Sequence, residues 1–189
     1  MLSRAQKLAR LASVGIAAVV EIDFSGEMSH LSGKAFIGLL KENLTIEKIV
    51  VGYNFRFGRA REAGSGDLRE MLVDTGIDVR VTDPVLRGHS IVSSSRIRKT
   101  IQEGDFAEAR AMLMADYSLD LRGVDSAGGR GSERRFLRRS IEQVLPAPGR
   151  YEVSVESGGR RSSAELDVGE DALTLAGGDI AEASEIIFH

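Results

Sequence analysis

The sequence contains no cysteine and no tryptophan, and only 5% of its 189 residues are aromatic. The absence of cysteine excludes disulfide bonds, thiolate metal sites and cysteine nucleophiles. The scarcity of aromatic side chains allows only a small surface for ring stacking. The net charge is −3, with 28% charged and 42% hydrophobic residues. This balance argues against bulk electrostatic binding to nucleic acid and is typical of a soluble globular protein.

Long apolar runs are missing as well. No stretch approaches the roughly 20 apolar residues that a membrane-spanning helix needs. The first residues, MLSRAQKLARLASVG, have a polar face and lack the apolar block of a signal peptide. We therefore expect no membrane partner and a cytoplasmic location.

Helical and strand-like patterns alternate in the first part of the chain, which predicts βαβ units in a parallel sheet. In such sheets, ligands bind where the carboxyl ends of strands meet helix starts. The expected helices cover residues 3–14, 31–43, 67–75, 93–103 and 105–115, and the expected strands cover 16–22, 47–53 and 77–82.

The pattern changes after about residue 117. Residues 123–132 form a turn-rich connector, and the segments 150–156, 164–168 and 172–175 alternate apolar and polar residues with period two. That alternation is typical of antiparallel strands in a small barrel or sandwich. The sequence thus predicts an α/β chain with two domains. A partial doubly wound domain covers residues 1–116, and a small antiparallel β barrel-like domain covers residues 117–189.

The first segment with chemical potential is GYNFRFGRAR, residues 52–61, which we call the arginine loop. Its glycines permit tight turns, its asparagine can bind a base edge or a hydroxyl, and its arginines suit phosphates. A solvated basic loop with two core phenylalanines explains the same residues equally well. The candidate ligand-binding residues of this loop are Gly52, Asn54, Phe55, Arg56, Phe57 and Gly58.

The second segment is VSSSRIR, residues 92–98, which we call the serine-rich helix start. Serines can cap a helix start, whose free amides and dipole attract an anion. With two arginines nearby, the segment could hold phosphate groups. Ordinary capping with exposed arginines is the more frequent explanation of such a pattern. The candidate residues here are Ser93, Ser94, Ser95 and Arg98.

Together the two segments resemble the bacterial bifunctional riboflavin kinase/FAD synthetase family. That family carries a G-x-[DN]-F-x-F-G segment followed by S-S-[ST]-x-I-R, which stand here as GYNFRFG (52–58) and SSSRIR (93–98). The stretch LSGKAFIGLLKENL resembles the helix that precedes the first motif in the family. The stretch IQEGDFAEARAMLMADYSL resembles the segment that leads into the kinase module. The resemblance covers about residues 4–122.

The resemblance implies a Rossmann-like nucleotidyltransferase domain that binds ATP, Mg²⁺ and FMN and transfers AMP to FMN, giving FAD. It implies that the arginine loop lines the nucleotide or flavin site. It also implies that the serine-rich helix start holds the ATP phosphates, with Arg98 and Ser94 assigned to catalysis. Catalysis of this kind depends mostly on positioning and charge neutralisation. Two alternatives stay open: a catalytically inactive flavin- or nucleotide-binding remnant, and an adenylyltransferase that acts on another phosphate, such as phosphopantetheine.

Two departures from the family pattern shape these expectations. The family's first strand and its phosphate-neutralising H-x-G-H turn are missing, and His30, His89 and His189 do not replace them. The family's first two strands lie in the middle of its sheet, and without them we expect exposed apolar edges. We therefore expect an upstream segment, a rearrangement or self-association to complete the sheet. The kinase segment G-F-P-T-A-N is also missing after residue 122. We therefore expect a degenerate riboflavin kinase-like domain without kinase activity.

Metal ligands are not evident in the sequence. Asp23, Asp78 and Asp83 lie at or near predicted strand ends, where an acidic side chain could approach Mg²⁺. Turn and capping roles are commoner for acids in such places. No metal-binding residue is therefore assigned.

Overall fold

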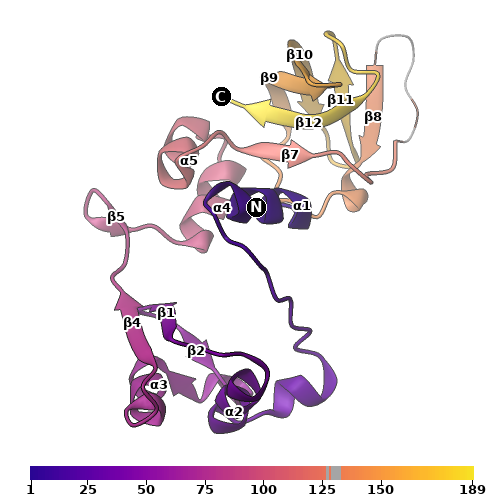
Figure 1. Cartoon of the computed structure of the whole chain (residues 1–189). Helices are drawn as coiled ribbons and strands as arrows, with labels where there is room; N and C mark the ends of the chain where they lie inside the picture. Colours follow the sequence, from indigo (N-terminus) through magenta and orange to yellow (C-terminus); the bar gives the residue numbers. More distant parts are fainter. Residues whose placement is uncertain (127, 129–132) are drawn as a thin grey trace. The chain divides into compact units, whose positions relative to one another are not determined.

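The computed structural model describes residues 1–126, 128 and 133–189 (Figure 1). It divides into two compact units. The α/β unit is Val20–Ile91, and the β unit consists of Met1–Val19 together with Val92–His189. The domain boundary expected between residues 116 and 117 stays a prediction. The predicted connector 123–132 lies largely outside the described residues.

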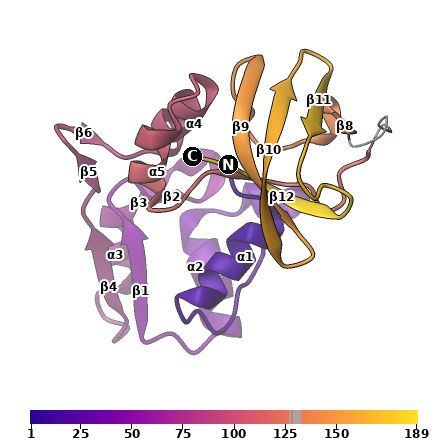
Figure 2. The same cartoon turned by 90° about the horizontal axis from the view of Figure 1, so that it is seen from above.

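A curled antiparallel sheet forms the β unit. Six strands within the described part of the chain pair in the order β7-β12-β9-β10-β11-β8, and they curl into a half-barrel (Figure 2). The predicted barrel-like domain is thus confirmed. The strands are β7 (Ser118–Asp120), β8 (Glu133–Leu137), β9 (Gly149–Ser157), β10 (Arg160–Val168), β11 (Ala172–Ala176) and β12 (Ala183–Phe188).

Two helices pack on this sheet. Helix α4 (Ser94–Gln102) and helix α5 (Phe106–Leu113) lie side by side in Figures 1 and 2 and contact each other. Ile101 and Ala109 are completely buried, and the Phe106 ring stacks on Phe188 of β12 at 4.4 Å between centroids. The alternating strands bury one face against these helices, as amphipathic patterning predicts. The helices expected over 93–103 and 105–115 are therefore confirmed.

Helix α1 (Arg4–Ser13) belongs to the same unit and matches the prediction of a helix over 3–14. Ser3 caps it in a reciprocal arrangement with Gln6, whose backbone N–H donates to the serine hydroxyl and whose side chain accepts from the serine N–H. A short 3-10 helix, Arg138–Ser140, follows β8. No helix in the described residues has both the length and the apolar character needed to cross a membrane.

The α/β unit contains a parallel pair of strands with its own small core. Strand β1 (Lys48–Gly52) pairs in parallel with β4 (Asp78–Thr82), and helix α3 (Ser65–Leu72) lies between them in the chain. This arrangement is the predicted βαβ unit. Helix α2 (Gly33–Asn43) contributes to the same core. Short elements complete the unit: β2 (Arg56–Phe57), β3 (Ala63–Gly64), β5 (Leu86–Arg87), β6 (Ser90–Ile91) and 3-10 turns at Gly26–His30 and Arg59–Arg61.

The prediction of a strand over residues 16–22 is wrong. These residues form no strand in the structure, and Ile16, Val19 and Val20 are 47%, 43% and 70% exposed. A strand needs a neighbour for its backbone hydrogen bonds, and this segment pairs with none among the described residues. Strand β1 likewise pairs only with β4 in this part of the chain, and Val50 is 56% exposed. The exposed apolar side chains expected of an incomplete sheet are therefore present.

Candidate functional site

The arginine loop begins where β1 ends. Gly52 is paired with Thr82 of β4, and the Tyr53 N–H donates to the Thr82 carbonyl at 3.0 Å. The Phe55 N–H then donates to the Gly52 carbonyl at 3.0 Å, which closes a tight turn. The loop therefore occupies the carboxyl end of a parallel strand, the position predicted for a ligand-binding segment.

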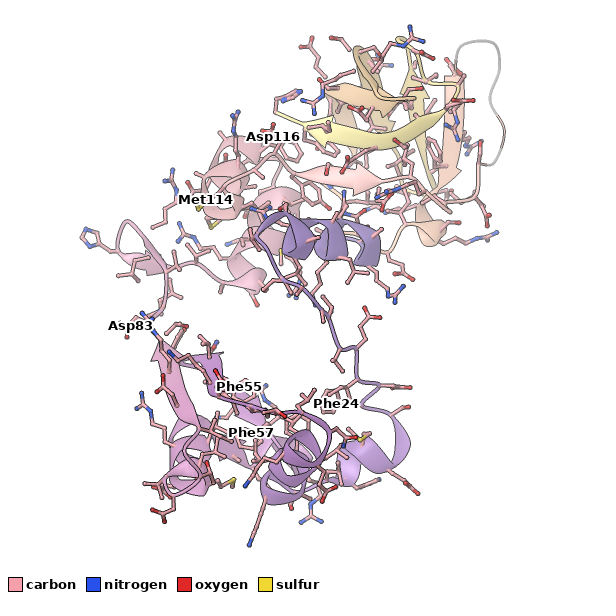
Figure 3. The ribbon with its side chains drawn as sticks, viewed as in Figure 1. Phe24, Phe55, Phe57, Asp83, Met114 and Asp116 are labelled. Atoms are coloured by element: carbon pink, nitrogen blue, oxygen red, sulfur yellow. The ribbon has the colours of Figure 1, made fainter. Side chains whose placement is uncertain are left out.

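The two phenylalanines of the loop differ in burial. Phe57 is only 7% exposed and belongs to the core of the α/β unit, whereas Phe55 is half-buried. Their rings stack with centroids 5.4 Å apart (Figure 3). A core role, one of the two interpretations of the sequence, therefore applies to Phe57. A ligand-lining role for either ring stays a prediction.

Polar groups of the loop are exposed. The side chains of Asn54, Arg56, Arg59 and Arg61 all face solvent. None of the three arginines forms an ion pair with another described residue. Because a guanidinium binds phosphate oxygens with two parallel hydrogen bonds, these groups are suited to an anion.

The serine-rich helix start forms as predicted in the β unit. Ser93 is the N-cap of α4, and its hydroxyl accepts a hydrogen bond from the Arg96 N–H at 3.3 Å. The N–H groups of Ser94 and Ser95 have no hydrogen-bond partner among the described residues. Free amides at a helix start, together with the helix dipole, attract an anion.

The arginines of this segment have separate roles. Arg96 pairs with Glu108 of α5 at 2.8 Å and so fastens α4 to α5. Arg98 is exposed and has no ion pair in the described part of the chain. Burial and the nearby positive charge of Arg98 lower the pKa of the Met1 amino group. Of the two, Arg98 has the guanidinium that is unpaired among the described residues, and its assignment to the ligand site stays a prediction.

Each candidate residue thus lies within one of two segments, and each segment lies in a different compact unit. The arginine loop brings together Gly52, Asn54, Phe55, Arg56, Phe57 and Gly58. The serine-rich helix start brings together Ser93, Ser94, Ser95 and Arg98. Their joint action on one pair of substrates stays a prediction.

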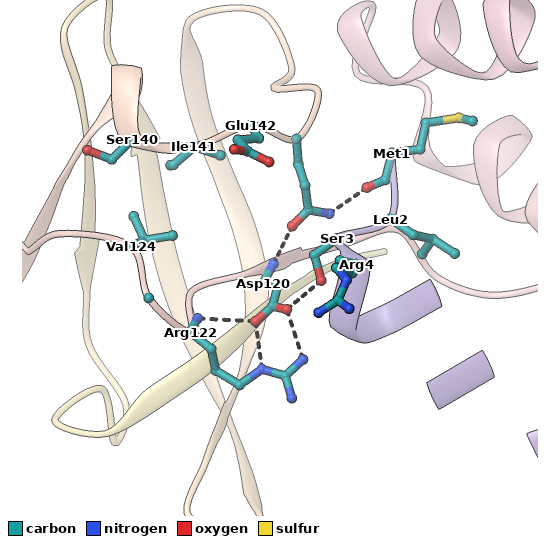
Figure 4. Close-up of a pocket in the computed structure, with 12 residues that line it drawn as sticks. Met1, Leu2, Ser3, Arg4, Asp120, Arg122, Val124, Ser140, Ile141 and Glu142 are labelled. Carbon is teal, nitrogen blue, oxygen red and sulfur yellow. Dashed lines mark hydrogen bonds and ion pairs between the residues drawn. The ribbon is translucent and has the colours of Figure 1, made fainter. Parts of the chain in front are cut away.

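A cavity of about 360 Å³ in the β unit was not anticipated from the sequence. On its wall Asp120 accepts hydrogen bonds from the Arg122 guanidinium, at 2.7 and 2.8 Å, and from the Ser3 hydroxyl (Figure 4). Burial alone would raise the pKa of Asp120, but the hydrogen bonds from Arg122 and Ser3 hold it below its usual value. Gln143 accepts from the Asp120 N–H at 2.7 Å. The network fastens α1 to the sheet.

Two of the three acids considered as metal ligands have ordinary structural partners. Asp23 accepts a hydrogen bond from the Ser25 N–H at 2.8 Å, and Asp78 pairs with Lys48 at 3.0 Å. Within the residues that the structure describes, no group of three or more His, Asp or Glu side chains is placed to hold a metal ion.

Comparison with known families decides the lineage. The FAD synthetase family matches residues 1–96, which include the GYNFRFG segment and the three serines at the start of α4. The chain belongs to the FAD synthetase family. The family relationship inferred from the two motifs is thereby confirmed.

Relatives within the family support the same assignment. A bifunctional riboflavin kinase/FMN adenylyltransferase of Escherichia coli K12 is 30% identical over 79% of this chain, and one of Listeria monocytogenes is 25% identical over 81%. An FAD synthetase of Listeria monocytogenes is 27% identical over 79% of this chain and 57% of its own length. The chain spans about half the length of the two bifunctional enzymes, 49% in each case.

A crystal structure of a Streptococcus pneumoniae protein described as a macrolide-efflux protein shares the fold. The TM-score is 0.79 at 22% sequence identity, over 99% of this chain and 69% of that one. At this identity the likeness concerns the fold alone.

Proposed function

We propose that this member of the FAD synthetase family is an FMN adenylyltransferase that makes FAD from FMN and ATP, without riboflavin kinase activity. The family match over residues 1–96 carries the proposal, since it includes every candidate residue of the two segments except Arg98. The exposed, unpaired guanidinium groups of the arginine loop and the free amides at the start of α4 supply the anion-binding chemistry that such a reaction needs.

The two segments would divide the substrates between them. The arginine loop, which combines aromatic rings with three arginines, would bind FMN, and the serine-rich helix start with Arg98 would bind the ATP phosphates. A phosphate oxygen of FMN would attack the α-phosphorus of ATP in line, forming a new P–O bond. The bond from that phosphorus to the bridging oxygen would break, and pyrophosphate would leave with the electron pair. Arg98 and the amides of Ser94 and Ser95 would stabilise the charge.

We propose Mg²⁺ only as the counter-ion of the ATP phosphates. Magnesium is usually bound by one or two carboxylates together with substrate phosphates, and the described residues present no ready cluster of acidic ligands. The ion would screen phosphate charge. A cytoplasmic location, and completion of the β1–β4 sheet by a further segment or by self-association, belong to the same proposal.

The deciding experiment incubates the purified chain with FMN, ATP and Mg²⁺ and measures FAD by chromatography with fluorescence detection. The proposal predicts equal amounts of FAD and pyrophosphate. Tight binding of FMN and ATP without FAD formation would favour the inactive remnant. Product formation with phosphopantetheine in place of FMN would favour the related adenylyltransferase. Conversion of riboflavin to FMN would refute the loss of kinase activity.

A further inference from the structure

The arginine loop is fastened to the start of helix α2 by close contacts. The Arg59 N–H donates to the Leu31 carbonyl at 2.7 Å. The Gly33 N–H donates to the Glu62 carboxylate at 2.9 Å. Gly58 approaches so closely that a Cβ atom there would lie 2.6 Å from the Gly33 nitrogen. The end of the loop and the first turn of α2 are therefore one packed assembly.

Glu62 is the acid that follows the three arginines, and it is the first acid after Glu47. An acid in this position would ordinarily pair with a neighbouring guanidinium. Its carboxylate instead accepts from a backbone N–H of the first turn of α2, whose own capping residue is Ser32. Negative charge at a helix start is favourable, and the N–H groups there lack partners within the helix. The arginines are left without an acidic partner in the described residues.

Backbone conformation shows that the loop needs such support. Ala60 and Arg61 have φ values of +53° and +60°, in the left-handed region that non-glycine residues avoid. Each such residue costs about 1–2 kcal/mol and persists only where surrounding contacts impose it. The bond of Glu62 to Gly33 follows directly after this pair in the sequence, and the bond of the Arg59 N–H to the Leu31 carbonyl directly precedes it. Contacts on both sides of the strained pair therefore hold it against the start of α2.

We propose that Glu62 is the positioning residue of the arginine loop. By binding the Gly33 N–H it holds the loop on α2 and keeps its arginines available for a phosphate monoester, so that the loop prefers FMN to riboflavin. The substrate in this statement rests on the proposed function, whereas the attachment of the loop does not. A glutamine at position 62 can still accept the hydrogen bond, but alanine cannot, and aspartate is one methylene too short.

The test compares Glu62→Ala, Glu62→Gln and Glu62→Asp in the full chain, with Glu70→Ala, another exposed glutamate of the same unit, as the matched control. Flavin fluorescence titration measures the affinities for FMN and riboflavin. We expect Glu62→Ala and Glu62→Asp to weaken FMN binding about tenfold, a loss of about 1.4 kcal/mol, and to change riboflavin binding little. Glu62→Gln and Glu70→Ala should bind FMN as the unchanged chain does.

Amide hydrogen exchange at Gly33 and Arg59 supplies the readout that needs no ligand. Exchange should quicken in Glu62→Ala and Glu62→Asp but not in Glu62→Gln or Glu70→Ala. Unchanged FMN affinity in Glu62→Ala despite faster exchange would overturn the positioning role. Equal losses of FMN affinity in Glu62→Ala and Glu62→Gln would also overturn it, because they would show that the carboxylate charge acts directly. If the unchanged chain binds no FMN, the proposed function and the FMN preference fail. In that case the amide exchange pattern alone decides whether Glu62 holds the loop on α2. Unchanged exchange in Glu62→Ala would overturn that attachment.

Discussion

Replacing Gly58 with alanine should loosen the arginine loop from α2. Gly58 has φ +77°, a left-handed conformation that costs an L-residue about 1–2 kcal/mol. The added Cβ would lie 2.6 Å from the nitrogen and 2.9 Å from the Cα of Gly33. These are backbone atoms that cannot swing aside, and overpacking of this kind costs about 1–3 kcal/mol. Together the two effects should destabilise the α/β unit by about 2–5 kcal/mol.

The assay must isolate that unit, because a chain with two compact units need not unfold in one step. Native-state hydrogen exchange at Leu68 and Leu72, each 1% exposed in the core of the α/β unit, reports its opening. A loss of about 2–5 kcal/mol corresponds to exchange about 30- to 4,000-fold faster.

The matched control is Gly38→Ala. Gly38 lies inside α2, and a Cβ there meets nothing within 4 Å. Alanine should therefore stabilise the helix by about 0.5–1 kcal/mol and slow exchange at the same amides. If Gly58→Ala also slows exchange, or leaves it unchanged while Gly38→Ala behaves as expected, the close approach of the loop to Gly33 is refuted.

Four further predictions concern the β unit. Met114 is 88% exposed with φ +55°, so Met114→Gly should raise stability by about 1 kcal/mol in thermal unfolding, and a lowered melting temperature would contradict this. Asp120→Ala removes the acceptor of the Arg122 guanidinium and the Ser3 hydroxyl and should cost about 1–3 kcal/mol in urea unfolding. Folding lowers the pKa of Asp120, so the ionised carboxylate stabilises the folded chain above the unfolded pKa of about 3.9. That contribution to the free energy of unfolding declines as the pH falls through the folded pKa. Asp120→Asn should therefore make the free energy of unfolding less dependent on pH in acid. Arg98→Ala should weaken ATP binding at least tenfold by calorimetry without unfolding the chain, whereas Lys99→Ala, on the same helix, should not.

Local pattern was sufficient for most elements. Helices α2, α4 and α5 have apolar residues at helical spacing behind a capping Ser or Asp, and β9 and β10 alternate with period two. These signals are local, and the structure contains them where they were predicted. The two motifs likewise lie on the strand end and the helix start to which the pattern assigned them.

Features that depend on distant partners could not be predicted. The segment 16–22 has strand composition, yet a strand forms only beside another strand. The sequence of strand β8, ERRFL, has the composition of a basic connector. Its pairing with β11 depends on residues far along the chain. Arg96 and Arg98 look alike in sequence, and only the position of Glu108 on α5 distinguishes the structural arginine from the free one.

The most direct test of the account is a double-mutant cycle on the affinity for FAD, the product that contains both halves of the reaction. Arg56→Ala alters the arginine loop, Arg98→Ala alters the serine-rich helix start, and the third variant carries both changes. If both segments bind one product at adjacent phosphates, the two losses should be non-additive, with a coupling of about 0.5–3 kcal/mol. Losses that add to within about 0.3–0.5 kcal/mol, or no FAD binding at all, would contradict the proposal that the two segments serve one adenylyl transfer.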